Sequence, residues 1–158
     1  MDLPFEIHKG ALMANLNFCI GNLSGDYILI ETINLEYPGD LDSDDAAWAN
    51  VKIKMQVGCW SGQYKGSLRI DELSQFSSNI DDLLSLRKNE VTFSPMEPWI
   101  VLTLTATDPE NFSIFGTAID EINDGNKLSF RFKVAKSDLS DTFSNLGKVL
   151  YLLQERKM

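Results

Sequence analysis

Most of this chain repeats with a period of two, which is the side-chain repeat of a β-strand buried on one face only. The clearest stretch is Ala49–Val57, in which apolar residues alternate with two lysines and a glutamine. The same repeat predicts strands over Leu16–Ile20, Tyr27–Leu35, Ala49–Val57, Gln63–Ile70, Trp99–Thr107, Ser113–Glu121 and Leu128–Val134. A chain with this many half-buried strands must bury their apolar faces in a shared core.

One strand pair has a predicted register. Asp124-Gly125 is typical of a two-residue hairpin turn, which would place Asn123 opposite Asn126. That register puts three largely apolar pairs on one face, namely Phe115–Val134, Thr117–Phe132 and Ile119–Phe130. The other face would then be mostly polar, as expected for a sheet with one solvated side.

Two segments follow the helical repeat instead. Asp71–Lys88 and Ser137–Gln154 carry apolar residues spaced by three and four, which predicts two amphipathic helices. We expect Arg87 and Lys88 in the last turn of the first helix, and Ser137 as the N-cap of the second. The predicted fold is therefore α+β, with a curved antiparallel sheet or sandwich of about seven to nine strands and two helices, in a single domain over 1–158.

The charge balance limits the partners. Lys and Arg number 14 and Asp and Glu 23, so the net charge is -9. Such a chain repels nucleic acid and anionic membranes, and we expect neither as a partner. The N-terminal residues lack the pattern of a secretory signal, and no apolar run is long enough to span a bilayer, so we expect a cytoplasmic protein. In that compartment Cys19 and Cys59 are expected to be buried free thiols, with a disulfide or a reactive thiol as the alternative.

No motif predicts catalysis. The single histidine, His8, has no Cys, Asp or Glu near it at the spacing of metal ligands, and neither cysteine lies in an activating motif. Asp40–Asp45 resembles the start of a calcium loop but lacks the glycine and the distal glutamate that such a loop requires. Gly58–Gly62 has neither the lysine nor the spacing of a phosphate loop and indicates a turn between strands. We therefore expect no enzymatic activity, no cofactor and no metal.

The acids are unevenly distributed. Residues 11–51 and 89–126 contain no Lys or Arg, yet each segment carries seven acids. One interpretation is ordinary acids of loops and strand surfaces. The other is an acidic face that docks a basic protein, with aromatic residues as anchors. The partner-binding residues predicted on this second interpretation are Glu36, Tyr37, Asp40, Asp42, Asp44, Asp45, Trp48, Asp108 and Glu110.

Several short motifs occur in a recognisable order: Asp44–Val51, then Asp71–Phe76 opening a helix, then Phe93–Pro98, and a last helix ending near Leu153–Arg156. Over about 44–156 this order resembles the WapI-type immunity proteins of bacterial polymorphic toxin systems. The resemblance implies a small cytosolic protein that binds and neutralises the C-terminal domain of a contact-delivered toxin, commonly a nuclease. An acidic inhibitor suits a nuclease because it mimics the charge of the substrate.

Two other classes stay open. A small-ligand-binding or hydrolytic domain would use a pocket in the curved sheet, with Glu97, beside Pro98 and Trp99, as the site carboxylate. A subunit that fills a scaffolding role in a larger assembly would need no site at all.

Overall fold

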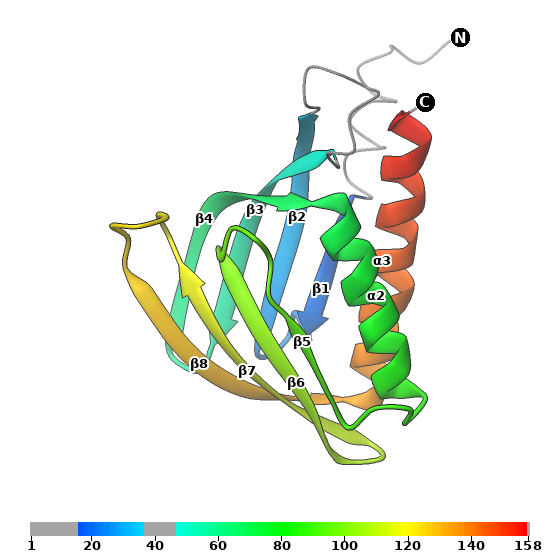
Figure 1. Cartoon of the computed structure of the whole chain (residues 1–158). Coiled ribbons are helices and arrows are strands. Elements are labelled where there is room, and N and C mark those ends of the chain that lie inside the picture. The colour runs from blue at the N-terminus through cyan, green and yellow to red at the C-terminus, as the bar shows by residue number, and fades with distance from the viewer. Residues whose placement is uncertain (1–15, 37–46, 158) are drawn as a thin grey trace, which may run out of the picture.

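The computed structural model of the chain describes residues 16–36 and 47–157. Four strands and a helix are followed by four more strands and a second helix (Figure 1). The first half contains β1 (Asn17–Gly21), β2 (Tyr27–Glu36), β3 (Trp48–Val57), β4 (Trp60–Arg69) and α2 (Ile70–Leu84). The second contains β5 (Glu90–Phe93), β6 (Ile100–Asp108), β7 (Asn111–Ile119), β8 (Lys127–Ala135) and α3 (Lys136–Lys157). The predicted α+β class, with antiparallel strands and two helices, is confirmed.

Each half forms its own sheet, in the orders β1-β2-β3-β4 and β5-β6-β7-β8, and the strands described do not close into a barrel. The two sheets face each other, and α2 and α3 run side by side along one flank (Figure 1). Seven strands match the predicted ones within a few residues. The eighth, β5, was not predicted, because at four residues it is too short to establish a repeat.

The register predicted for the β7–β8 hairpin is wrong. Phe115 lies opposite Arg131, not Val134, and Phe130 lies opposite Gly116. The difference of three residues is odd, so every β7 side chain moves to the other face of the sheet. Phe112 and Ile114 are therefore in the core, and Phe115 is on the outer face.

The cause of this shift is the loop that joins the two strands. The Asp120 carboxylate accepts a hydrogen bond from the Asn126 backbone amide at 2.7 Å, and the Asp120 amide donates to the Asn126 carbonyl at 3.2 Å. These bonds close a loop of seven residues instead of a two-residue turn. Gly125 fits tightly within it, since a Cβ there would lie 2.2 Å from the Glu121 carbonyl oxygen.

The first helix buries the predicted stripe, and Leu73, Phe76 and Ile80 face the core. It ends at Leu84, short of the predicted Lys88, because Leu86 adopts a φ of +61° and takes the backbone out of the helix. Arg87 and Lys88 therefore lie beyond the helix and not in its last turn. Arg87 nevertheless pairs with the Asp81 and Asp82 carboxylates at 2.8 and 2.9 Å.

The second helix packs beside the edge strand β1 and against α2. It begins at Lys136, so the predicted N-cap, Ser137, lies inside it. Thr142 fixes the contact with β1, because its hydroxyl donates a 2.6 Å hydrogen bond to the Cys19 carbonyl and the residue has no exposed surface. No helix within the described ranges is long and apolar enough to cross a membrane.

The two halves of the chain are in contact where Trp99 packs against β4. The Tyr64 hydroxyl donates a hydrogen bond of 2.6 Å to the Trp99 carbonyl, and the indole lies directly over Gly66. A Cβ at Gly66 would lie 2.7 Å from Trp99 Cγ, closer than packed carbon atoms approach. Gly66 thus provides the space in which the Trp99 indole packs.

Candidate functional site

Two adjoining hollows lie where the ends of β3 and β4 approach the free edge of β8. Their volumes are about 620 and 630 Å³, and both are lined by Asp26, Phe115 and Arg131. The remaining lining residues are Val57, Gly58, Cys59, Trp60, Ser113, Ser129, Phe130, Phe132 and Lys133. We call the area formed by both hollows the Trp60–Phe115 surface.

The first sheet contributes Trp60 from the tip of a tight hairpin. Gly58 and Cys59 form the two-residue turn, which confirms the turn predicted there, and Gly58 supplies the positive φ (+59°) that its first position requires. Asp26 stabilises the tip of this hairpin, because its carboxylate accepts a 2.9 Å hydrogen bond from the Gly58 amide. Trp60 lies at the end of its strand and is 63% exposed.

The second sheet contributes Phe115 and Arg131, which are cross-strand partners on its outer face. Apart from Arg131, the neighbours of Phe115 on that face are small: Ser113 and Thr117 along β7, and Thr103 opposite it on β6. The ring therefore stands above its surroundings and is 50% exposed. Phe115 and Trp60 are two of seven large hydrophobic side chains exposed in the described ranges, and they line the same hollow.

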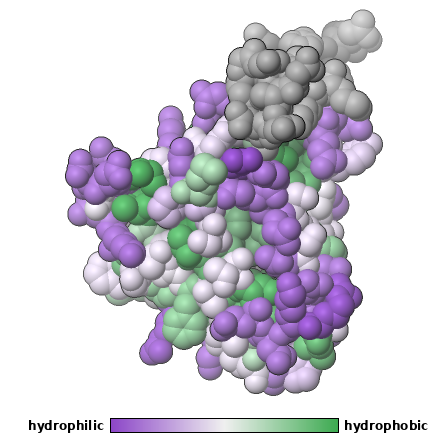
Figure 2. Space-filling view, in the orientation of Figure 1, coloured by the Kyte–Doolittle hydropathy of each residue, from purple (hydrophilic) through white to green (hydrophobic). Residues whose placement is uncertain are grey.

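The charge of this surface differs from that of the whole chain. Arg131 and Lys133 line it against a single acid, Asp26, whereas the chain as a whole carries -9. Neither base forms an ion pair with any residue the structure describes. Figure 2 shows one side of the molecule, where hydrophilic residues predominate and apolar areas are small. An apolar surface with a local positive charge is thus a distinct feature of this fold.

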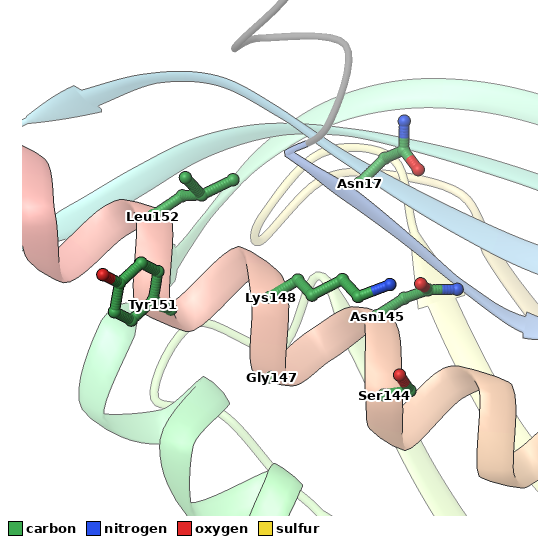
Figure 3. Close-up of a pocket in the computed structure, with 7 residues that line it drawn as sticks. All are labelled: Asn17, Ser144, Asn145, Gly147, Lys148, Tyr151 and Leu152. Atoms are coloured by element: carbon green, nitrogen blue, oxygen red, sulfur yellow. The ribbon is translucent and has the colours of Figure 1, made fainter.

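A third hollow, of about 710 Å³, lies between α3 and the edge of β1 (Figure 3). Its lining comes mainly from the exposed side of the helix, including Asn145, Lys148 and Tyr151, while Asn17 lies across from them on β1. Gly147 leaves the helix surface open, since a Cβ there would meet no atom within 4 Å. In Figure 3 the Lys148 side chain extends toward Asn145, whereas the Tyr151 hydroxyl points away from both.

Two of the predicted binding residues lie together. Glu36 and Trp48 are cross-strand partners at the end of the first sheet, and the Arg69 guanidinium lies 5.9 Å from the Trp48 ring centroid. Glu36 is exposed. The predicted residues between these two positions lie outside the described residues, as does the calcium-like segment; they are Tyr37, Asp40, Asp42, Asp44 and Asp45.

The other two predicted residues lie elsewhere. Asp108 and Glu110 form the exposed β6–β7 turn, and the Glu110 carbonyl accepts a hydrogen bond from the Lys136 amide at the start of α3. Trp48 follows Ala47, which shares a hollow with Leu153 near the other end of α3. Lys136, where α3 begins, and Leu153 are 17 residues apart, which corresponds to roughly 25 Å along the helix. Glu36 and the pair Asp108 and Glu110 therefore lie near opposite ends of α3.

The β6–β7 turn is stabilised by hydrogen bonds to Asp108, which lies within it. The Asp108 carboxylate accepts a 2.8 Å hydrogen bond from the Glu110 amide and two bonds of 3.1 Å from the Asn111 side chain. The bond from Glu110, followed by those from Asn111, lowers the pKa of Asp108 below its ordinary value of 3.8. Asp108 is consequently ionised at neutral pH and has a structural role in the turn.

Glu97, which was predicted as the carboxylate of a ligand-binding or hydrolytic site, forms a hydrogen bond with a residue close to it in the sequence. Its carboxylate accepts a 2.9 Å hydrogen bond from the Trp99 indole nitrogen. It lines none of the hollows described above, nor a smaller one of about 210 Å³ between α2 and β5. This hydrogen bond orients the Trp99 ring, which packs over Gly66.

The two cysteines differ. Both are free thiols, but Cys59 is exposed, and the expectation that it is buried is wrong because it lies at the tip of the β3–β4 turn. Cys19 is half-buried, and burial, together with the nearby charge of Asp138, raises the pKa of its thiol to about 11. Among the described residues, no three His, Cys, Asp or Glu side chains are grouped as metal ligands would be; His8 lies outside this part of the chain.

Comparison with known proteins gives one family. The model described as "Immunity protein WapI-like family" matches residues 19–153, from within β1 to the last third of α3. A comparison with curated proteins gives no match. Among solved structures, the chain is similar to one described as "Crystal structures of trypanosoma bruciei MRP1/MRP2", at 11% identity and a TM-score of 0.47, covering 99% of this chain and 96% of that one. A likeness at that TM-score supports no conclusion.

Proposed function

Since the chain belongs to the WapI-like immunity protein family, we propose that it neutralises a protein toxin by binding the toxic domain directly. The observation that carries this proposal is the extent of the match, 19–153, which includes strands of both sheets and both helices. The family module is thus the two-sheet fold itself and not a short motif within it.

Binding alone is sufficient for this task, and we propose no catalytic step. A specific protein interface buries about 800 Å² on each partner, roughly a tenth of the 9177 Å² accessible surface of this chain. An area of that size extends beyond any single loop of the fold. We therefore expect the interface to draw on more than one element of the fold.

For the finer question of how the toxin is recognised, we propose that acids contribute. The end of the first sheet has Glu36 and Trp48, and the segment between them is rich in aspartate. A toxin domain that acts on nucleic acid must be basic where it holds phosphate, so negative charge here would speed association and compete with the substrate. Asp108 and Glu110 would form a separate, smaller acidic site at the start of α3.

The test is binding to the toxic C-terminal domain encoded by the gene immediately upstream. The wild-type protein should form a stable complex in calorimetry and abolish the activity of that domain in a matched assay. Absence of both would contradict the proposed function. The complex should also weaken as salt increases, because screening reduces the attraction between opposite charges.

Charge reversal tests the acidic contribution separately. Replacing Asp40, Asp42, Asp44 and Asp45 together by Lys should weaken the complex and flatten its salt dependence. The control is reversal of four exposed acids elsewhere on the fold, namely Glu121, Asp124, Asp141 and Glu155. If both sets change the affinity equally, net charge alone is responsible; if neither changes it, the four aspartates between 40 and 45 have no part in recognition.

A further inference from the structure

We infer that the Trp60–Phe115 surface is the principal docking site for the toxin domain, and that it receives an apolar side chain next to a carboxylate. This inference rests on the proposed function, that the chain binds a toxin, but places the main energy of binding away from the acids. Three independent features of the surface support it: the kind of side chains exposed, their charge and their rigidity.

The exposed side chains are of the kind that dominates protein interfaces. Tryptophan, tyrosine and arginine are over-represented among the residues whose loss costs most binding energy, and Trp60, Phe115 and Arg131 lie around one hollow. Single exposed hydrophobic residues need no explanation, but two aromatic rings from different sheets that share a hollow do.

The charge specifies the partner. Arg131 and Lys133 are outward-facing on the edge strand β8, and only Asp26 opposes them within the two hollows. The Asp26 carboxylate already accepts a hydrogen bond from the Gly58 amide. A partner that buries the aromatic rings must therefore also supply negative charge, since burying a guanidinium without a partner is costly. The matching element is an apolar segment of the toxin domain that carries Asp or Glu.

The frame of the surface is already ordered. The β1–β2 turn is closed by hydrogen bonds from the Asn22 amide to the Asp26 carbonyl at 3.0 Å and from the Gly25 amide to the Asn22 carbonyl at 2.8 Å. The Asp26 carboxylate then fixes the β3–β4 tip beside it. Phe115 and Arg131 are held in paired strands. Little conformational entropy would be lost on binding, which favours affinity.

The experiment measures the affinity of the same upstream-encoded toxin domain for three single variants, Trp60→Ala, Phe115→Ala and Arg131→Glu. Each should weaken the complex at least about tenfold while its melting temperature stays close to that of the wild type. The matched control is Met96→Ala, a large apolar residue that is 67% exposed on the β5–β6 connection. It should bind within about twofold of wild type.

The outcomes separate this inference from the proposed function. If the wild type binds and all three variants bind equally well, the docking site is elsewhere and the toxin-binding function stands. If the wild type does not bind, the proposed function fails and this inference fails with it. Sedimentation of the chain alone adds a further outcome: a dimer that Trp60→Ala converts to a monomer would mean that a second copy occupies the surface, which would also overturn the inference.

Discussion

Phe115 lies directly opposite Arg131 on the outer face of the second sheet, where its ring is half exposed. In the register predicted from the Asp124-Gly125 turn, the same ring would face the core opposite Val134. The difference changes the role of Phe115 from a core residue to a surface one. It also places an aromatic ring and a guanidinium together at an open edge of the fold.

The register can be tested by stability. Phe115→Ala should lower the free energy of unfolding by only about 1 kcal/mol, because half of the side chain is exposed in the folded protein. Phe112→Ala on the same strand should cost about 3–5 kcal/mol, because Phe112 is fully buried. Urea unfolding of both variants measures this difference. Equal costs, or a larger cost at Phe115, would contradict the observed register.

The contact between the two halves depends on a glycine. Gly66→Ala should lower the free energy of unfolding by about 1–3 kcal/mol, since the new methyl group would be forced against the Trp99 indole. Gly62→Ala is the matched control, on the same strand and face, where a Cβ meets nothing within 4 Å. Thermal unfolding should show Gly62→Ala as stable as the wild type or more so. A Gly66→Ala variant equal to it would exclude tight packing at Trp99.

The β6–β7 turn should lose stability in acid. The pKa of Asp108 is lower in the folded protein than its ordinary value of 3.8, so the carboxylate contributes stability that is present above pH 3.8 and lost as the pH falls through the folded value. In Asp108→Asn the amide oxygen can still accept the Glu110 hydrogen bond, but the group no longer titrates. Urea unfolding between pH 5 and pH 2 should show a shallower loss for the variant. Parallel curves would show that Asp108 has no such role.

The sequence predicted the elements of this fold better than their pairing. Alternation of apolar residues located seven strands, and a spacing of three and four located the stripe of α2, because burial on one face imposes each repeat directly. It could not locate the end of α2, which is set by the positive φ of Leu86. It also missed the register of β7 and β8, because Asp120 closes a wider loop around a dipeptide that is typical of a tight turn.

The Trp60–Phe115 surface was not predicted from the sequence. Charge counting selected acids, and among the described residues these lie at separate ends of the fold. Trp60, Phe115 and Arg131 come together only when both sheets are assembled, so no local pattern marks them. The sequence held one signal of the wider β7–β8 loop, namely Asp120 six residues before Asn126. These two residues together allow the loop to close on itself.

Alkylation of Cys59 is the most direct test that the toxin domain covers the Trp60–Phe115 surface, because this exposed thiol lines it. Cys19 is an internal control, since its pKa of about 11 leaves roughly one thiol in a thousand ionised at pH 8. In the free protein iodoacetamide should modify Cys59 well before Cys19, as read by mass spectrometry. In the saturated complex, modification of Cys59 should slow at least about tenfold, and that of Cys19 should not change. An unchanged rate at Cys59 in a complex that gel filtration shows to be fully formed would contradict docking at this surface.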